Sequence, residues 1–415
     1  MKKLLAAIIA ILLVFGGFLY WSVQKTPAEP APVLSDAPAP ESAPAEEPAA
    51  VAGEPADAAG ESAEPVEIRR LDFDAIRALY PADEPVLSME GESVSWGEYS
   101  DILCATGMDI QNYFEQMAAY YGMAADWNGS VGDDTGRSFA EYAVDDTRRY
   151  LESCLAVRGF AAEQGVTLSE EELQSLEPEA LAKEILGEEA TAEELFATLQ
   201  SEGNMSYETY RSMRETGMLY DKTVDLLYGH DGEKVSEEEA VAWLEEQGFL
   251  AAGHILLMTM DPNTGEALDE EAARAKETRA GEIAAELQGI KDREKLLKRF
   301  AELKEAECED TGKTVYPDGY TFEPGTMVTE FEEAVRGLKD YAVSDPVQTA
   351  YGYHVIMRLP LQGDASLITL TGDGSSARQA LAQTGISSAL EAFQAEHPAQ
   401  LAAGLDTLDL TAFLK

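Results

Sequence analysis

The hydrophobic positions of residues 67–248 recur mostly at helical spacing. They predict helices near 96–122, 138–164, 191–202 and 206–229. Capping boxes, in which Ser or Thr is followed three residues later by Glu, mark three helix starts: Ser169 with Glu172, Thr191 with Glu194, and Ser236 with Glu239. Residues 86–96 instead predict a short β-hairpin that leads into the first long helix. This part of the chain is therefore expected to be mainly helical.

Residues 249–361 follow a different pattern. The expected elements are, in order, a buried strand at 251–258, helices at 269–288 and 292–306, a short helix at 329–337 and a final strand at 352–357. Strand, helices and strand in this order predict an α+β module with a small sheet. The helical pattern returns in residues 366–415, most clearly at 377–397.

An unbroken uncharged run covers residues 4–23. As a helix, such a run rises about 30 Å, which matches the hydrocarbon core of a bilayer. Lys2 and Lys3 precede it, so we expect a single-pass anchor with the N-terminus in the cytoplasm and every later residue outside the cytoplasmic membrane. A cleaved signal peptide is the alternative, although its apolar region is normally shorter, about 7–15 residues.

Residues 26–66 hold nine of the 18 prolines and no Lys, Arg or aromatic residue. Such a segment cannot bury enough apolar area to offset its ordering entropy, so it is predicted to be a disordered Ala/Pro/Glu-rich linker. The expected division of the chain is an anchor or signal segment at 1–25, a linker at 26–66, a helical domain at 67–248, an α+β domain at 249–361 and a C-terminal helical segment at 362–415.

Charge and composition then limit the function. The 415 residues include 30 Lys plus Arg and 78 Asp plus Glu, for a net charge of −48. Nucleic-acid binding needs clustered cations, so no nucleic-acid partner is expected. Three cysteines cannot form a disulfide framework, but Cys104 and Cys154 could form one disulfide or remain two buried thiols.

Two of the four histidines, His254 and His354, lie in apolar strand patterns. Taken singly, each is best explained as a hydrogen-bonded core histidine. A metal site with Asp310 as a third ligand is an alternative, but no HxxxH or HExxH spacing supports it, and no metal or other cofactor is expected. The acidic loop at 127–134 could contact calcium but lacks EF-hand spacing, so a solvated loop is the better interpretation.

Three motifs around these histidines resemble the parvulin-type (PpiC-like) peptidyl-prolyl cis/trans isomerases. Residues 253–256 (GHIL) are similar to the opening strand of that family, 322–334 (FEPGTMVTEFEEA) to its central signature, and 345–356 (DPVQTAYGYHVI) to its closing strand. The motifs occur in the family's order and are together far more specific than any one of them.

The resemblance implies four catalytic residues: His254, Asp310, Thr349 and His354. The histidines would face each other beneath the active site. Asp310 would lie near the substrate carbonyl, and Thr349 would belong to the network that fixes the histidines. Cys308 falls at a place usually held by Ser, so it is not expected to be an active thiol.

The resemblance also implies four substrate-binding residues: Met327, Phe331, Tyr320 and Tyr351. Met327 and Phe331 would line the apolar pocket for the proline ring. The family's Gly-Gly-Asp-Leu-Gly-like run is replaced here by residues 316–320 (YPDGY), so the resemblance does not define the pocket wall at Tyr320. Residues 259–265 lack an Arg/Lys cluster, which argues against the phosphate-selective branch of the family.

Residues 86–99 resemble the start of the chaperone domain of PrsA/SurA-type foldases, and residues 405–410 resemble its closing segment. The implied α+β architecture is a small parvulin domain inserted in a mainly helical chaperone lobe that both chain ends build. The implied function is a cofactor-free isomerase and foldase for unfolded secreted chains with Xaa–Pro bonds. The alternatives are a holdase chaperone with an inactive parvulin domain and an acidic scaffold outside the membrane. The sequence favours no oligomeric state.

Overall fold

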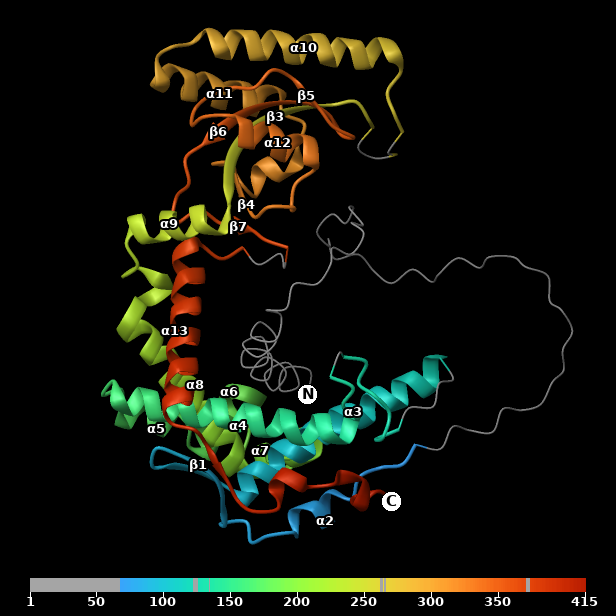
Figure 1. Cartoon of the computed structure of the whole chain (residues 1–415), viewed down its shortest axis with the longest axis vertical. Helices are drawn as coiled ribbons and strands as arrows, with labels where there is room; N and C mark the ends of the chain where they lie inside the picture. Colours follow the sequence, from blue (N-terminus) through green and yellow to red (C-terminus); the bar gives the residue numbers. More distant parts are fainter. Residues whose placement is uncertain (1–67, 122–125, 134, 262–263, 265, 371–373) are drawn as a thin grey trace, which may run out of the picture. The chain divides into compact units, whose positions relative to one another are not determined.

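The computed structural model describes residues 68–121, 126–133, 135–261, 264, 266–370 and 374–415 (Figure 1). These residues form two compact units. Unit 1 runs to Tyr220 and resumes at Ala392–Lys415, and unit 2 is Asp221–Glu391. The predicted anchor at 4–23 and linker at 26–66 lie outside the described residues. Within the described ranges, no helix has both the length and the apolar character needed to cross a bilayer.

Unit 1 is mainly helical, as predicted. Its elements are α2 (Phe73–Arg77), β1 (Pro85–Met89), β2 (Glu92–Ser95), α3 (Trp96–Tyr121), α4 (Phe139–Glu163), α5 (Glu170–Ser175), α6 (Pro178–Leu186), α7 (Ala192–Glu202), most of α8 (Tyr207–Tyr228), β8 (Gln400–Leu401), and the short 3-10 helices η3 (Leu405–Thr407) and η4 (Leu410–Phe413). The four helices expected from apolar spacing are present, and the three predicted capping boxes are formed.

Both ends of the described chain contribute to unit 1. Strand β1 forms the predicted hairpin with β2, and its other edge pairs with β8 in the order β2-β1-β8. The hairpin turns at Glu90 and Gly91, whose φ angles of 45° and 89° are left-handed. Farther along, the Asp72 amide donates to the Phe413 carbonyl at 2.7 Å. The last residues of the chain are thus held against the first described ones.

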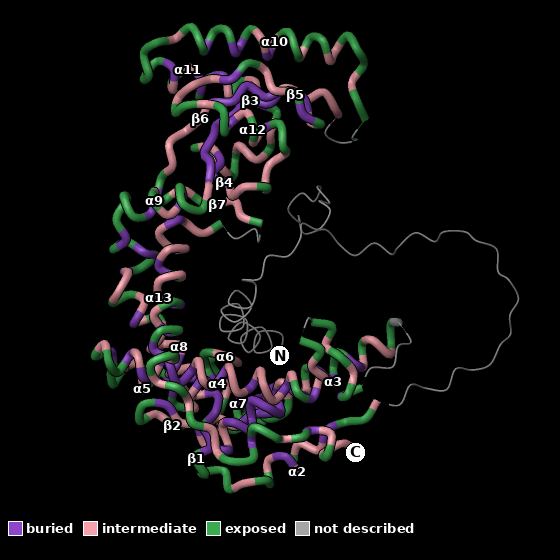
Figure 2. The backbone as a smooth tube through the Cα atoms, viewed as in Figure 1, coloured by how far each residue is buried: buried purple, intermediate pink, exposed green. Residues whose placement is uncertain are grey.

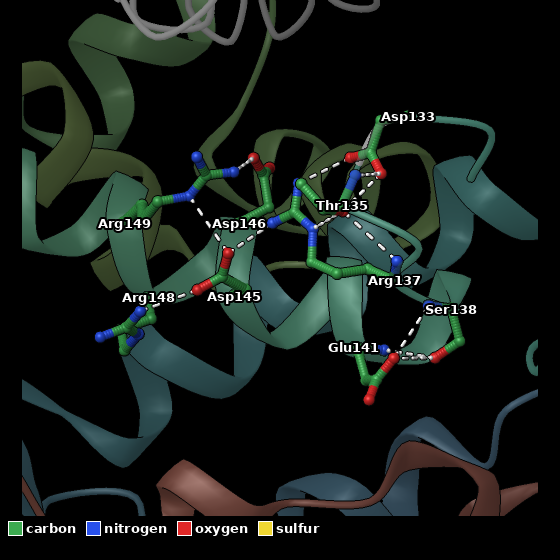
Figure 3. Close-up of polar contacts among 9 residues, drawn as sticks. All are labelled: Asp133, Thr135, Arg137, Ser138, Glu141, Asp145, Asp146, Arg148 and Arg149. Atoms are coloured by element: carbon green, nitrogen blue, oxygen red, sulfur yellow. Dashed lines mark hydrogen bonds and ion pairs between the residues drawn. The ribbon is translucent and has the colours of Figure 1, made fainter. Parts of the chain in front are cut away.

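The acidic loop before α4 is held by arginine. Arg137 contacts Asp133 at 2.9 Å and Asp145 at 2.5 Å, so it links the loop to the first turns of the helix (Figure 3). A fourth capping box, which sequence analysis did not identify, starts α4: the Ser138 amide donates to Glu141 Oε2 at 2.9 Å. The Asp133 carboxylate therefore has protein partners in this loop.

The cysteines of unit 1 are free thiols. Cys104 and Cys154 are both buried and unpaired by a disulfide, so the second of the two alternatives applies. Burial in apolar surroundings raises the pKa of Cys104 to about 12 and that of Cys154 to about 11. Both are therefore protonated core residues.

Unit 2 contains the small sheet and the helices that cover it. Its elements are the end of α8, η1 (His230–Gly232), α9 (Glu237–Gln247), β3 (Leu250–Met258), α10 (Glu270–Gly289), α11 (Arg293–Glu307), η2 (Thr311–Thr314), β4 (Tyr320–Phe322), α12 (Thr329–Gly337), β5 (Val347–Gln348), β6 (Gly352–Leu359), β7 (Leu367–Ile368) and most of α13 (Ala377–Glu396).

The sheet has the strand order β5-β6-β3-β4-β7, with β3 and β6 antiparallel at its centre. Figure 2 shows burial concentrated on these central strands, and all residues of β3 except Met258 are buried. Ile255 and Val355 pack with α10 and α11, whereas Ile356 packs with α12 and β4 on the other face. The period-two alternation of strands thus gives β6 one face toward each helical layer.

The sheet extends beyond the expected end of the α+β domain at residue 361. Strand β7 pairs in parallel with β4, through Thr321 with Leu367 and Phe322 with Ile368. Leu367 also belongs to a core cluster with Leu244 of α9 and Ala377 of α13. Unit 2 accordingly begins before residue 249 and ends after residue 361.

Candidate active site

Two histidines face each other on the α12 side of the sheet. His254 of β3 is paired with Ile356, and His354 of β6 with Leu256, so the histidines are diagonal neighbours. Their Nδ1 atoms lie 3.4 Å apart, and the two residues are 7% and 4% exposed respectively. The central strand pair therefore produces the facing arrangement that the resemblance implied.

Each histidine also has a partner at its outer nitrogen. His254 Nε2 lies 2.8 Å from Asp310 Oδ2, and His354 Nε2 lies 2.8 Å from Thr349 Oγ1. Thr349 Oγ1 in addition accepts a hydrogen bond from the Tyr351 amide at 3.1 Å. The four residues proposed as catalytic from the resemblance thus form one hydrogen-bonded series, in the order Asp310, His254, His354, Thr349.

The two histidines of this hydrogen-bonded series differ in how readily they take up a proton. Burial, reinforced by the neighbouring His254, lowers the pKa of His354 to about 3, so this ring is neutral at ordinary pH. Burial also acts against a charge on His254, but hydrogen bonds with Asp310 and Cys308 outweigh it and raise its pKa. A protonated His254 can donate from Nε2 to Asp310 and from Nδ1 to His354, which then donates from Nε2 to Thr349.

Among the four hydrogen-bonded residues, Asp310 is the most exposed to solvent. Its side chain is 21% exposed. Burial raises the pKa of its carboxyl, but hydrogen bonds from His254, Tyr320 and the Gly312 amide together hold it well below the usual range. Asp310 precedes η2 and accepts from the Gly312 amide at 2.9 Å. The site therefore presents a fixed carboxylate at its partly open end.

An apolar cluster covers the histidine pair. The Phe331 ring of α12 stands edge-on to both imidazoles, with centroids 5.3 Å from His254 and 5.5 Å from His354. Phe322 of β4 lies 6.0 Å from Phe331, and half-buried Met327 packs against the same cluster. Met327 lies in the turn before α12, so it reaches the cluster from outside the helix.

The other two predicted substrate-binding residues, Tyr351 and Tyr320, differ in position. Tyr351 packs against the cluster that α10 and α11 cover, on the other side of the sheet from Met327 and Phe331. Tyr320 is beside the pocket cluster, but its hydroxyl donates to Asp310 Oδ2 at 2.5 Å. The assignment of the Tyr320 ring to substrate contact stays a prediction, whereas its hydroxyl is bound to Asp310.

One pocket residue was not singled out from the sequence. Phe322 is fully buried and belongs to the same cluster as Tyr320 and Phe331. Its period-two spacing from Tyr320 was the available signal, because alternate residues of a strand share a face. The strand β4 has only three residues, which are too few for a periodic pattern to identify it.

Known proteins resemble part of this chain. Residues 254–359 match the Rotamase family, described as a PPIC-type PPIASE domain. Foldase protein PrsA of Geobacillus kaustophilus is 41% identical over 125 residues, which cover 30% of this chain and 36% of the relative. Chaperone SurA of Methylococcus capsulatus is 32% identical over 114 residues, which cover 27% of this chain and 22% of the relative. The chain thus spans little more than a third, or less, of the length of these curated relatives.

Among solved structures, PrsA from Bacillus subtilis is 17% identical, with 76% of this chain and 90% of that chain covered. The TM-score is 0.22, which is too low to support a shared arrangement. The assignment rests instead on the family match. The matched residues include all four hydrogen-bonded side chains from Asp310 to Thr349, and also Phe331, which covers the histidines. Residues 254–359 therefore form a parvulin-type, or PPIC-type, rotamase domain.

Proposed function

We propose that unit 2 catalyses cis/trans isomerisation of Xaa–Pro peptide bonds. The observation that carries this proposal is the facing pair of His254 and His354 beneath Phe331, with the Asp310 carboxylate at the partly open end. Rotation about an amide bond crosses a barrier of about 18–20 kcal/mol because it breaks the resonance of the peptide group. No bond is cleaved, so the reaction needs an environment that favours the twisted amide.

The two halves of the site suit the two ends of that amide. Phe331 and Met327 offer an apolar surface for the proline ring. The Asp310–His254 pair offers fixed charges beside the rotating carbonyl, and fixed dipoles act strongly where water is excluded. His354 and Thr349 are buried below this pair and hold its orientation. Binding and electrostatic stabilisation thus come from different elements of the same sheet face.

The test is a proline isomerisation assay on the purified full chain, with peptides that vary the residue before proline. We expect catalysis by the wild type and a loss of about tenfold or more in kcat/KM for His354→Ala and for Met327→Ala. His397→Ala is the matched control, because this histidine lies in unit 1, where it contacts Glu90 at 2.9 Å. Wild-type turnover in both site variants would contradict the assignment.

We further propose that the protein is a foldase that binds unfolded secreted chains. Foldase PrsA and chaperone SurA are relatives of part of the chain, and unit 1 exposes large apolar side chains. Tyr120 is 82% exposed, Tyr113 44% and Phe196 42%. Exposed apolar side chains of this kind suit contacts with unfolded polypeptides.

Aggregation of a reduced secreted protein tests client binding. The wild type should suppress aggregation, and Tyr113→Ser with Phe196→Ser should weaken that suppression without changing peptide isomerisation. Suppression by a wild type that does not catalyse isomerisation would favour the holdase alternative. Unchanged suppression in the double variant would contradict client binding at these side chains.

The proposed location is the outer side of the cytoplasmic membrane, with residues 4–23 as the anchor. The support is the uncharged run and the lysines that precede it. Protease added to spheroplasts should digest units 1 and 2 while a cytoplasmic marker survives. Protection of both units until the membrane is broken would contradict this location.

A further inference from the structure

Three donors from three elements fix the Asp310 carboxylate. Oδ2 is 2.8 Å from His254 Nε2 of β3 and also accepts the hydroxyl of Tyr320 of β4 at 2.5 Å. Oδ1 accepts the Gly312 amide of η2 at 2.9 Å. Tyr320 and His254 therefore share one oxygen, and the Tyr320 hydroxyl sets where that oxygen lies relative to the imidazole.

The surroundings leave the Tyr320 hydroxyl little freedom. A Cβ atom on Gly312 would lie 2.2 Å from that hydroxyl oxygen, so only glycine at 312 allows the contact. The Tyr320 ring packs against Tyr316, with centroids 5.1 Å apart, and against His254 at 5.4 Å. Tyr320 is 9% exposed, so the residue is enclosed by the protein.

We propose that Tyr320 is a positioning residue of the isomerase, whose hydroxyl holds Asp310 Oδ2 against His254. The inference rests on the proposed function, because it assigns a role within the Asp310–His254 pair. Without the hydroxyl, the partly exposed carboxylate turns toward water while Oδ1 stays on the Gly312 amide. The pair then loses its fixed geometry, and catalysis falls without any loss of apolar pocket surface.

The protonation states favour a hydrogen bond in which the Tyr320 hydroxyl donates and the Asp310 carboxylate accepts. Burial and then the contact with Asp310 raise the pKa of Tyr320, so the phenol keeps its proton and donates. The other titratable groups that act on this pair are His354 on β6, and Lys304 and Cys308 at the end of α11. Tyr316 adds a further phenol beside Tyr320. None of these four has a direct hydrogen bond to the Asp310 carboxylate among the contacts of the described residues, so the hydroxyl of Tyr320 has no substitute.

The test uses nuclear magnetic resonance of the histidine rings in the full chain, where only four histidines occur. We expect the measured pKa of His254 to fall in Tyr320→Phe, because the carboxylate leaves the imidazole. Gly312→Ala, which displaces the hydroxyl but keeps the tyrosine, should lower it too. Tyr316→Phe is the matched control and should leave it unchanged. Urea unfolding of each variant checks that unit 2 is folded.

An unchanged or raised pKa of His254 in Tyr320→Phe overturns the proposal, because a hydroxyl that only competes for Oδ2 would strengthen the ion pair when removed. An equal fall in Tyr316→Phe also overturns it, because packing rather than the hydroxyl would then be responsible.

Kinetics provide the second arm. Tyr320→Phe should lower kcat by about tenfold with little change in KM, as expected for a lost hydrogen bond to a charged group. In an Asp310→Asn background the same substitution should have almost no effect, because coupled residues are not additive. A raised KM with unchanged kcat would show that Tyr320 only lines the substrate pocket and would overturn the proposal. If the wild type itself does not catalyse isomerisation, the proposed function fails, while the pKa of His254 still decides the placement of Tyr320.

Discussion

The hydroxyl oxygen of Thr349 lies 2.8 Å from Nε2 of His354, and both residues are more than nine-tenths buried. When His254 is protonated, its Nδ1 donates to the neutral His354, whose proton then lies on Nε2 and is donated to Thr349. A threonine on the loop beside β5 thus fixes the tautomer of a histidine on β6. The same hydroxyl accepts the Tyr351 amide, which ties the loop to the network.

Thr349→Val should therefore leave the buried His354 Nε2 without its hydrogen-bond partner. The expected loss is about 1–3 kcal/mol in the free energy of unfolding, together with reduced isomerase activity. Urea unfolding and the peptide assay measure the two effects. Thr278→Val is the control, because Thr278 is exposed on α10 and its hydroxyl donates to the Arg274 carbonyl of its own helix. Equal effects of the two substitutions would contradict the role of Thr349.

The lowered pKa of His354 also predicts how the free energy of unfolding depends on pH. Its pKa is about 3 in the folded chain, because of burial and the charge of His254. An unfolded histidine has a pKa of about 6.5, so between these values the unfolded chain binds a proton that the folded chain does not. Stability from this residue is therefore present above pH 6.5 and declines as the pH falls, by about 1.4 kcal/mol per pH unit.

The measurement is urea unfolding at about pH 5 and pH 6.5 for the wild type and His354→Gln. Subtracting the variant removes the contributions of the many carboxyl groups that both proteins share. The wild type should lose more stability on acidification than the variant does. Identical losses would show that His354 is not held neutral in the folded chain.

The long helices and the central strands could be predicted because their signals are local. Amphipathic spacing and a capping box suffice to place α7, and an apolar run suffices for β3. The strands β7 and β8 have two residues each and exist through pairing with distant strands. No periodic pattern can develop over two residues, so their positions depend on tertiary contacts that the sequence does not display.

The candidate site divides in the same way. The histidine pair and Phe331 lie on regular elements, and motif resemblance located them. The position of the Tyr320 hydroxyl depends instead on the turns between Asp310 and β4. Gly319 has a φ of +113° there, and a Cβ atom on it would lie 2.9 Å from the Ala252 carbonyl oxygen. Steric limits at single residues set the course of the backbone through these turns. The resemblance could therefore place Tyr320 in the site, but it could not show that the Tyr320 hydroxyl donates to Asp310.

A buried ion pair in unit 1 gives the third prediction. Arg158 of α4 contacts Glu98 of α3 at 2.8 Å and Ser212 of α8 at 2.7 Å, and both charged side chains are 13% exposed. Arg158→Met leaves the Glu98 carboxylate buried without its ion-pair partner and should destabilise unit 1 by about 3–5 kcal/mol. Adding Glu98→Gln should restore much of that loss.

The control for this prediction is Arg148→Met on the same helix. Arg148 contacts Asp145 at 2.7 Å (Figure 3), but its side chain is 40% exposed. Exposed pairs contribute about 0–1 kcal/mol, so urea unfolding should show only a small change. Similar losses for the two arginines would mean that burial of the Arg158–Glu98 pair does not decide its importance.

Two helical glycines predict opposite effects of one substitution. A Cβ atom on Gly159 of α4 would lie 2.8 Å from the ring of Phe393, which is 5% exposed in the core of unit 1. Gly159→Ala should therefore destabilise the chain by about 1–3 kcal/mol through overpacking. Around the same position on Gly281 of α10, no heavy atom of the described residues lies within 4 Å apart from the neighbouring backbone of the helix itself. Gly281→Ala should stabilise by about 0.5–1 kcal/mol, because alanine has the higher helix propensity. Thermal and urea unfolding of both variants measure the two signs, and a stabilising Gly159→Ala would show that Phe393 can move aside without loss of packing.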